Sequence, residues 1–543
     1  MKVIITTILF YHVSLAQLVY PDDRVLNIFG SPPTSTQQAR GINTNDQIDL
    51  LLSQGITNLA ISINNLNLNE NKNVVFSPVS IASALALLLL ASNGRTFQEL
   101  TNVMGLSSGI NVSSRTQDVH EHLGQLFKTL ERNSADFNGI VRIAAAIFVE
   151  NYFPIRSLYK DTSTSIYRTE IRNLGFSSQP GYAQNVINNW VNEKTNGKIT
   201  NIIDEPPPAD TKVIIVSALY FNGAWEMPFF DGSTRRRNFY PNGRKSQSNI
   251  QAEMMANGGQ FPYYKDQSLN CEIMGFPYKG NETTLYVIMP SGSNKEVLKQ
   301  FERRLTANDI ERLISNTKYR SSVVLFPKMR LESTMSLKGT LQNLGVNALF
   351  NPQLANLALL SPGPGNLENR SPVIPQNHKN NRNEFLIFNR FGNDDDDESN
   401  DSETNCTQIF DPNSNITRCE EVDKITHKQV TYKKFGDKVG RRVTRQIGID
   451  SLDKLRSVLN GDPSKLNVEN PGLYADKVLH KVYIDITETG TEAAAVTSTS
   501  LYRGGDIVTF RVDVPFLFFI RNEQTRLTLF WGTVYEPTPN YRV

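Results

Sequence analysis

A run of small residues near the C-terminal end of the chain constrains its fold more than any other feature. Between Glu492 and Arg503 the sequence has no charged residue and no proline, and most side chains are alanine, valine, serine or threonine. Such a segment enters a β-sheet readily, because its side chains need little room and no charge loses its water. Left exposed, it can pair with a free strand edge. Standing alone, it would be interpreted as a solvent-exposed linker.

Periodic apolar patterns elsewhere predict both helices and strands. Apolar residues recur at three- and four-residue steps from Ile48 to Ile63, the period of an amphipathic helix. Ser77 and Pro78 begin a second, buried helix through residues 81–90. Later segments have strand patterns, namely residues 142–149, 212–221, 285–289, 322–326, 508–514, 516–520 and 527–534. Helices first and strands last indicate an α+β protein with large mixed or antiparallel sheets.

The net charge excludes several classes of partner. The 56 lysines and arginines nearly balance the 54 aspartates and glutamates, which leaves a formal charge of +2. A chain with so little net charge has no overall field that attracts nucleic acid or an anionic membrane. We therefore expect neither as a partner, and any charge-driven partner must bind at a local cluster.

The first residues predict secretion. Residues 1–16 combine Lys2, an apolar run at residues 3–10 and small residues just before Gln17, which is the pattern of a cleaved signal peptide. The apolar run is too short to span a bilayer. Residues 17–45 are rich in Pro, Ser, Thr, Asn and Gln and predict a flexible extension. We expect a secreted, extracellular protein without a membrane anchor.

A charged insertion interrupts the apolar pattern at residues 362–469. It contains an acidic run at residues 394–398 and a basic run between Lys424 and Arg445, with few aromatic residues. Blocks of opposite charge usually indicate solvated disorder, and a partner-binding or processing site is the alternative. Without the leader, the extension and this insertion, residues 46–361 and 470–543 leave roughly 390 residues for a single folded body.

Cysteines and glycosylation signals agree with an oxidising compartment. Cys406 and Cys419 lie in a stretch rich in turn residues, and a disulfide between them would add roughly 3 kcal/mol to stability. Cys271 adjoins a strand pattern, which predicts an inert, half-buried thiol. Three scattered cysteines offer no zinc framework. Six asparagines occupy acceptor triplets for N-glycosylation: Asn111, Asn281, Asn369, Asn400, Asn405 and Asn415.

The sequence lacks the motifs of common enzymes. It has no Gly-x-Ser-x-Gly elbow, no phosphate-binding loop and no dinucleotide fingerprint. His120 and His122 are two apart rather than four, so they cannot share one helix face as zinc ligands, and we expect a solvated helix surface there. These observations disfavour an enzyme and predict no metal and no cofactor.

Motifs spread along the chain resemble those of the serpins, the serine protease inhibitor family. They follow one another in family order: Asn73-Val-Val-Phe-Ser-Pro-Val-Ser-Ile81, Asn189-Trp-Val-Asn192, Thr195-Asn-Gly-Lys-Ile199, Ala218-Leu-Tyr-Phe-Asn-Gly-Ala-Trp225, Phe326-Pro-Lys328, Val478-Leu-His-Lys481, Gly490-Thr-Glu-Ala-Ala-Ala495 and Pro515-Phe516. The resemblance covers nearly the whole chain, and it identifies residues 46–361 and 470–543 as the two parts of one serpin domain.

The resemblance implies both a fold and an activity. The fold is α+β, with three β-sheets, eight or nine helices and an exposed reactive loop at residues 490–513. A target protease cleaves the loop and becomes acylated, and the cut loop then enters the main sheet as a new strand. The small-residue hinge of inhibitory members matches Glu488, Gly490, Thr491, Glu492, Ala493, Ala494, Ala495 and Val496. The hinge favours an inhibitor over the alternative, a non-inhibitory binding or carrier protein.

The resemblance also implies a shutter region under the main sheet. Ser77, Ser80 and His480 match the family there, whereas Ser217 stands where the family usually has asparagine. We expect this departure to weaken one hydrogen bond that holds the sheet closed.

The attacked bond is assigned by counting from the hinge. The commonest family spacing places Gly504 at the attacked position, and a loop shorter by one residue places Arg503 there. We choose Arg503-Gly504, because arginine fits the acidic pocket of a trypsin-like protease and glycine offers no side chain to recognise. The Gly504-Gly505 bond remains the alternative. A solubilising loop charge is the other interpretation of Arg503.

The implied partner is a trypsin-like serine protease in an extracellular cascade of the clotting or immunity type. Residues 116–132, which match the heparin-binding helix of some serpins, mix both charges, so we do not predict activation by heparin. Arg235, Arg236 and Arg237 are expected to lie in a solvated strand turn. We expect a monomer.

Overall fold

The computed structural model describes most of the chain outside its two ends, its insertion and its predicted loop. The described residues are 44–68, 72–107, 116–136, 139–246, 248–364, 407–411, 416–422, 429–435, 438–441, 471–491 and 507–537. The chain divides into two units, Met1–Gln47 and Ile48–Val543. The first unit contributes only residues 44–47, at the start of the first helix, to the described part.

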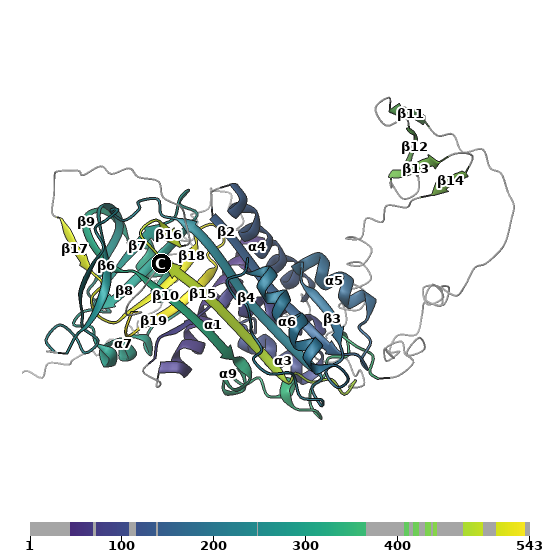
Figure 1. Cartoon of the computed structure of the whole chain (residues 1–543), viewed down its shortest axis with the longest axis horizontal. Helices are drawn as coiled ribbons and strands as arrows, with labels where there is room; N and C mark the ends of the chain where they lie inside the picture. The colour runs from purple at the N-terminus through teal and green to yellow at the C-terminus, as the bar shows by residue number, and fades with distance from the viewer. Residues whose placement is uncertain are drawn as a thin grey trace, which may run out of the picture. The chain divides into compact units, whose positions relative to one another are not determined.

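Nine α-helices and one 3₁₀ helix lie in the described residues (Figure 1). They are α1 (Thr44–Asn67), α2 (Pro78–Ala91), α3 (Gly94–Val103), α4 (Thr116–Asp136), α5 (Ser157–Tyr167), α6 (Pro180–Lys194), α7 (Lys295–Glu302), α8 (Ala307–Ser315), α9 (Leu337–Asn343) and the 3₁₀ helix Ala348–Phe350. Helix α2 is buried along its whole length, and the Ser77 side chain caps it by accepting the Ser80 N–H. This confirms the buried helix predicted after Ser77.

Six strands form the main sheet, which carries the candidate site. In spatial order they are β10 (Met329–Ser336), β15 (Lys477–Ile486), β16 (Gly490–Thr491), β4 (Val213–Ala224), β2 (Gly139–Glu150) and β3 (Glu170–Leu174). Strand β15 pairs directly and in parallel with β4 from Lys477 to Val482, whereas β16 lies between the two strands further along. The main sheet is therefore closed over part of its length and split over the rest.

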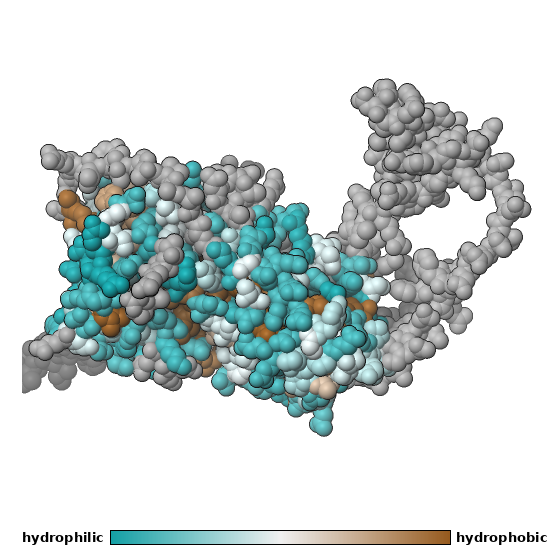
Figure 2. All heavy atoms as spheres, viewed as in Figure 1, coloured by the Kyte–Doolittle hydropathy of each residue, from teal (hydrophilic) through white to brown (hydrophobic). Residues whose placement is uncertain are grey.

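A second sheet contains nine strands. Eight follow the order β1 (Val74–Phe76), β19 (Thr528–Val534), β18 (Phe516–Asn522), β8 (Thr283–Pro290), β7 (Cys271–Pro277), β6 (Ile250–Asp266), β9 (Lys318–Pro327) and β17 (Val508–Arg511), and β5 (Arg235–Phe239) pairs with β6. The end strand β17 pairs in parallel with β9. Figure 2 shows hydrophobic residues at the surface beside β17. Ile507, just before this strand, is 59% exposed.

Four short strands within the charged insertion form an antiparallel sheet of their own. They are β11 (Thr407–Asp411), β12 (Ile416–Val422), β13 (Gln429–Phe435) and β14 (Lys438–Arg441). We expected no secondary structure there, because the charge blocks dominate the composition. The strands nevertheless contain β-branched and aromatic residues between the charges, which favour extended backbone. The domain boundaries at residues 362 and 469 stay a prediction.

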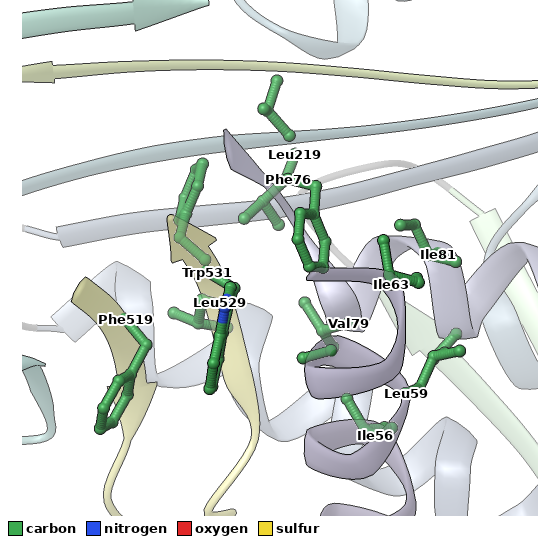
Figure 3. Close-up of a cluster of buried hydrophobic side chains, with 14 of the residues drawn as sticks. Ile56, Leu59, Ile63, Phe76, Val79, Ile81, Leu219, Phe519, Leu529 and Trp531 are labelled. Atoms are coloured by element: carbon green, nitrogen blue, oxygen red, sulfur yellow. The ribbon is translucent and has the colours of Figure 1, made fainter. Parts of the chain in front are cut away.

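The core joins elements that are far apart in the sequence. Figure 3 shows Ile56, Leu59 and Ile63 of α1 facing side chains of α2, while Leu529 and Trp531 come from β19. All of these side chains are buried. Burial of large apolar side chains between helices and two sheets confirms the α+β class expected from the sequence.

No helix in the described part of the chain is long and apolar enough to cross a membrane.

Candidate functional site

Strand β16 begins the predicted loop and lies inside the main sheet. After β15 ends at Ile486, the chain turns through residues 487–489 and runs back between β15 and β4. The Thr487 N–H and hydroxyl both donate to the Gly490 carbonyl, at 2.9 and 2.8 Å. Thr491 is paired with Ile486 of β15 on one side and Gly223 of β4 on the other. The loop thus departs from between two strands of the main sheet.

Glycine is required at the first position of β16. Gly490 has φ +148°, a conformation that side-chain-bearing residues rarely adopt. A Cβ atom built there would lie 2.2 Å from the carbonyl oxygen of Gly223. The close approach of the β16 and β4 backbones explains why β16 begins with glycine.

The Thr491 side chain fills a closed space beneath the sheet. It is fully buried, and its hydroxyl lies 2.8 Å from the Tyr278 hydroxyl. Tyr278 stacks on Trp225 with ring centroids 4.4 Å apart and meets the edge of Phe221 at 4.8 Å. Burial raises the pKa of Tyr278, so this phenol stays protonated and can hydrogen-bond to Thr491. A small β-branched residue fits this space.

Glu488 anchors the turn that precedes β16. Its carboxylate accepts a hydrogen bond from the Thr234 hydroxyl at 2.5 Å and forms an ion pair with Lys328 at 3.0 Å. Burial acts to raise the pKa of Glu488, but the Thr234 and Lys328 contacts outweigh it and lower the pKa. The Phe229 N–H donates to the Glu488 carbonyl at 2.8 Å. Side chain and backbone of Glu488 therefore both hold the turn.

His480 lies at the centre of the predicted shutter. The Ser77 backbone N–H donates to His480 Nε2 at 2.9 Å, so that nitrogen is an acceptor. In the neutral ring the proton is then on Nδ1, which lies 2.9 Å from Ser217 Oγ and 3.3 Å from Ser80 Oγ. Burial lowers the pKa of His480 to about 3, so the ring is neutral at physiological pH.

The shutter fastens the closed part of the main sheet. His480 of β15 and Ser217 of β4 are direct partners in the parallel register, and both are fully buried. We expected serine at position 217 to weaken a hydrogen bond, yet its hydroxyl keeps a short contact with His480 Nδ1. Separating β15 from β4 must break this contact, so the shutter opposes opening of the sheet.

The neutral shutter histidine predicts acid sensitivity. Between about pH 6.5 and 3 the unfolded chain protonates His480 while the folded chain does not, so stability falls with pH in this window and is retained above it. The expected slope is about 1.4 kcal/mol per pH unit. Buried His120 adds in the same direction, whereas Glu302, with its pKa raised by burial to about 8, acts in the opposite one.

The variant His480→Asn isolates this contribution. Thermal unfolding of wild type and variant between pH 7 and 5 should show a smaller loss of stability on acidification in the variant. If stability depends on pH equally in the two proteins, His480 does not have the lowered pKa that keeps it neutral in the folded chain.

The remaining predicted site residues divide into described and undescribed groups. The structure brings Glu488, Gly490 and Thr491 together at the hinge, and Ser77, Ser80, Ser217 and His480 together at the shutter. The other hinge residues, Glu492, Ala493, Ala494, Ala495 and Val496, lie outside the described residues, as do the reactive-bond residues Arg503 and Gly504.

The predicted reactive loop ends earlier in the sequence than the family resemblance implies. Residues 490–513 were expected to be loop, but Val508–Arg511 form β17. Asp513 is buried and accepts hydrogen bonds from Arg244 at 2.8 Å and Arg511 at 2.7 Å. Strand pairing and these arginine contacts fix the chain from Val508 onwards.

The structure describes only some of the cysteines and glycosylation acceptors predicted from the sequence. Cys271 is buried rather than half-buried, and burial raises the pKa of its thiol to about 12, which disfavours the reactive thiolate form. Asn281 is exposed and lies in the turn between β7 and β8. The bridge between Cys406 and Cys419 and the acceptors Asn111, Asn369, Asn400, Asn405 and Asn415 lie outside the described side chains.

The expectation of a solvated surface at His120 was wrong. His120 is fully buried, and its Nδ1 lies 2.5 Å from the Tyr167 hydroxyl of α5. His122, on another face of α4, pairs with Asp49 of α1 at 2.8 Å. Val119, His120 and Leu123 lie on the same side of α4, and all three are buried. The His120 ring therefore packs with the apolar side of the helix. No group of metal-binding residues occurs in the described part of the chain.

The sequence did not reveal the residues that support the hinge. Lys328 and Trp225 occur in the family-like motifs, but nothing indicated that Lys328 pairs with Glu488 or that the Trp225 indole N–H donates to the Thr487 carbonyl at 2.9 Å. Thr234 and Tyr278 gave no signal. Only the opposite charges of Lys328 and Glu488 could have suggested one of these contacts.

Comparisons with known proteins identify the family of the chain. The family model described as "Serpin (serine protease inhibitor)" matches residues 54–374 and 454–537. Serine protease inhibitor 28Dc of Drosophila melanogaster is 27% identical over 95% of this chain and 86% of its own length. Intracellular coagulation inhibitor 2 of Tachypleus tridentatus is 30% identical over 52% of this chain and 67% of its own.

Solved structures show the same fold. Human thyroxine-binding globulin aligns with a TM-score of 0.63 and 18% identity over 91% of this chain and all of its own. Mouse protein Z-dependent protease inhibitor aligns with a TM-score of 0.61 and 20% identity over 91% of this chain and all of its own. With the family model matching most of the chain and the hinge seated in the main sheet, the chain belongs to the serpin family and is by family a serine protease inhibitor, not an enzyme.

Proposed function

We propose that the chain is a secreted inhibitor of trypsin-like serine proteases that is cleaved after Arg503 and traps the protease as an acyl-enzyme. One observation carries this proposal: Gly490 and Thr491 already occupy the first two positions of a new strand between β15 and β4. The hinge is thus aligned for the rest of the loop to follow it into the main sheet.

The register of β16 defines where the rest of the loop would lie. Because β16 is antiparallel to β4, each further loop residue pairs one residue earlier in β4. Continuing the register places Thr497 opposite both Ser217 and His480, and Leu501 opposite Val213, the first residue of β4. The inserted strand would therefore replace the β4–β15 pairing at the shutter and use the full length of β4.

Alternation along that strand fits the sequence of the loop. Side chains two residues apart face the same side, so Ala493, Ala495, Thr497 and Thr499 would follow the buried Thr491 toward the core. All four are small, and none carries a charge into the interior. Insertion into a sheet that has already formed therefore explains why the loop contains a run of small, uncharged residues.

Trapping then follows from ordinary acyl-transfer chemistry. The protease serine attacks the Arg503 carbonyl, an ester forms, and the Arg503–Gly504 bond breaks as the Gly504 amine leaves with a proton. Insertion of about a dozen residues at about 3.3 Å each would form a strand of roughly 40 Å and carry the ester-linked protease along the sheet. Displacement before water hydrolyses the ester leaves the protease covalently held.

Arg503 supplies the specificity in this proposal. Its guanidinium can pair with the buried carboxylate in the primary pocket of a trypsin-like protease. It is the only basic residue between Gly490 and Gly504. Relatives named "Intracellular coagulation inhibitor" in Tachypleus tridentatus support a role in a proteolytic cascade.

Incubation with trypsin followed by a denaturing gel tests the proposal. We expect a covalent complex and a released C-terminal fragment whose sequence begins at Gly504. Trypsin with its serine blocked is the control and should give neither product. Clean cleavage without a complex would contradict the proposal and favour a non-inhibitory binding or carrier protein.

Secretion has a separate test. The signal pattern of residues 1–16 and the exposed Asn281 acceptor support an extracellular site of action. Protein recovered from culture medium should begin at Gln17 and lose mass on treatment with an N-glycosidase. Retention inside cells with Met1 intact would contradict secretion.

A further inference from the structure

A basic pocket lies at the β3 edge of the main sheet. It is open to solvent and has a volume of about 420 Å³. Its lining residues come from α5, β3 and the end of α6, which are labelled in Figure 1. Its eight lining residues include the cations Lys160, Arg168, Arg172 and Lys194 and the carboxylate Glu170. Half of these side chains are cationic and only one is acidic.

The pocket carries more positive charge than its carboxylates neutralise. Arg168 pairs with Glu131 of α4 at 3.2 Å, and Arg172 reaches Glu170 only at 3.9 Å. Burial raises the pKa of Glu131, although Arg168, Lys194 and Arg142 act to lower it. With Glu131 and Glu170 both ionised, the four lining cations still leave an excess of positive charge at one small site.

Helix dipoles account for only part of this cluster. Arg168 caps α5 and Lys194 is in the last turn of α6, where cations interact favourably with helix C-termini. Arg168 is held in place there, with φ +53° and its N–H bonded to the Thr164 carbonyl at 3.0 Å. Lys160 lies near the N-terminal end of α5, where a cation is unfavourable, and Arg172 belongs to a strand. Both side chains are exposed.

We propose that this pocket binds a compact polyanion that carries several sulfate or phosphate groups. Arginine donates paired hydrogen bonds to such oxyanions, and lysine provides a mobile point charge. A pocket of about 420 Å³ is within the range of small-molecule sites and is large enough for more than one oxyanion group. Sulfated and phosphorylated sugars share this chemistry.

The site is separate from the machinery of the proposed function. In the main sheet, β3 is an edge strand, and β2 and β4 lie between it and the hinge strand β16. Its lining includes no residue of the reactive loop and none of α4, which meets the pocket through the contact of Glu131 with Arg168. Ligand binding can therefore be measured on the intact chain without a protease.

Titration of the full chain with two probes tests the pocket. Sucrose octasulfate and inositol hexakisphosphate are each titrated by calorimetry at low ionic strength and again at 0.3 M salt. We expect one saturable site that weakens with salt, because screening reduces each charge contact. Tighter binding of the first probe identifies a sulfated ligand, and tighter binding of the second a phosphorylated one; either supports the proposal.

A matched pair of variants separates the pocket from general charge. The double variant Arg172→Ser/Lys194→Ser should weaken binding by about tenfold or more, since two charged contacts are lost. The control Arg235→Ser/Arg237→Ser removes the same charge from the exposed strand β5 and should bind like wild type. Equal weakening in both variants, unchanged binding in the first, or no saturable binding of either probe would overturn the proposal. Circular dichroism and thermal unfolding verify that both variants fold.

Discussion

Replacement of Arg503 by alanine should reduce the rate of trypsin inhibition by about a hundredfold or more. The substitution removes the side chain that would enter the acidic pocket of the protease, and truncating one partner of a buried charge pair costs about 2–5 kcal/mol. The second-order rate constant for loss of trypsin activity measures the effect directly. Arg503→Lys keeps the charge and should retain much of the rate.

A second protease provides the control that the loop of Arg503→Ala can still insert. Arg503→Ala should still form a covalent complex with a protease that prefers small residues, because the hinge and the main sheet are unchanged. If Arg503→Ala inhibits trypsin at the wild-type rate, the attacked bond is not Arg503–Gly504, and Gly504–Gly505 becomes the assignment to test.

Replacement of Thr491 by arginine should convert the inhibitor into a substrate. Thr491 is fully buried between β15 and β4, and its hydroxyl meets the Tyr278 hydroxyl at 2.8 Å. A long cation cannot take this place without losing its water in an unpaired site. Insertion should therefore lag behind ester hydrolysis, and the fraction of protease found in the complex should fall about tenfold or more.

The ratio of covalent complex to cleaved inhibitor on a denaturing gel measures this partition. Thr491→Ser retains the hydroxyl and a small volume, so it should stay close to wild type. An unchanged complex yield with Thr491→Arg would show that insertion does not pass through the position observed for β16.

Much of the fold could be predicted because its signals are local. The apolar period from Ile48 to Ile63 and the Ser77-Pro78 start correspond to α1 and α2, and the uninterrupted apolar run at residues 212–221 corresponds to β4. The strands of the insertion were missed, because the charge runs there outweighed a weak alternation. His120 was missed for another reason: its burial depends on Tyr167 of a different helix.

The candidate site could be predicted only where neighbouring residues carry the signal. The small side chains after Gly490 identify the hinge, but the partners that hold it come from distant parts of the chain. Tyr278 lies 213 residues before Thr491, and Thr234 lies 254 residues before Glu488. No periodicity in a single sequence connects such pairs, because they meet only when the two sheets pack together.

The thermal stability of the cleaved chain tests directly whether the cut loop becomes a strand between β15 and β4. A protease that cuts within residues 497–503 without being trapped separates the hinge side of the loop from β17. We expect the unfolding temperature of the cleaved chain to rise by about 10 °C or more, because a full strand is added to the main sheet. An unfolding temperature equal to that of the intact chain would contradict loop insertion.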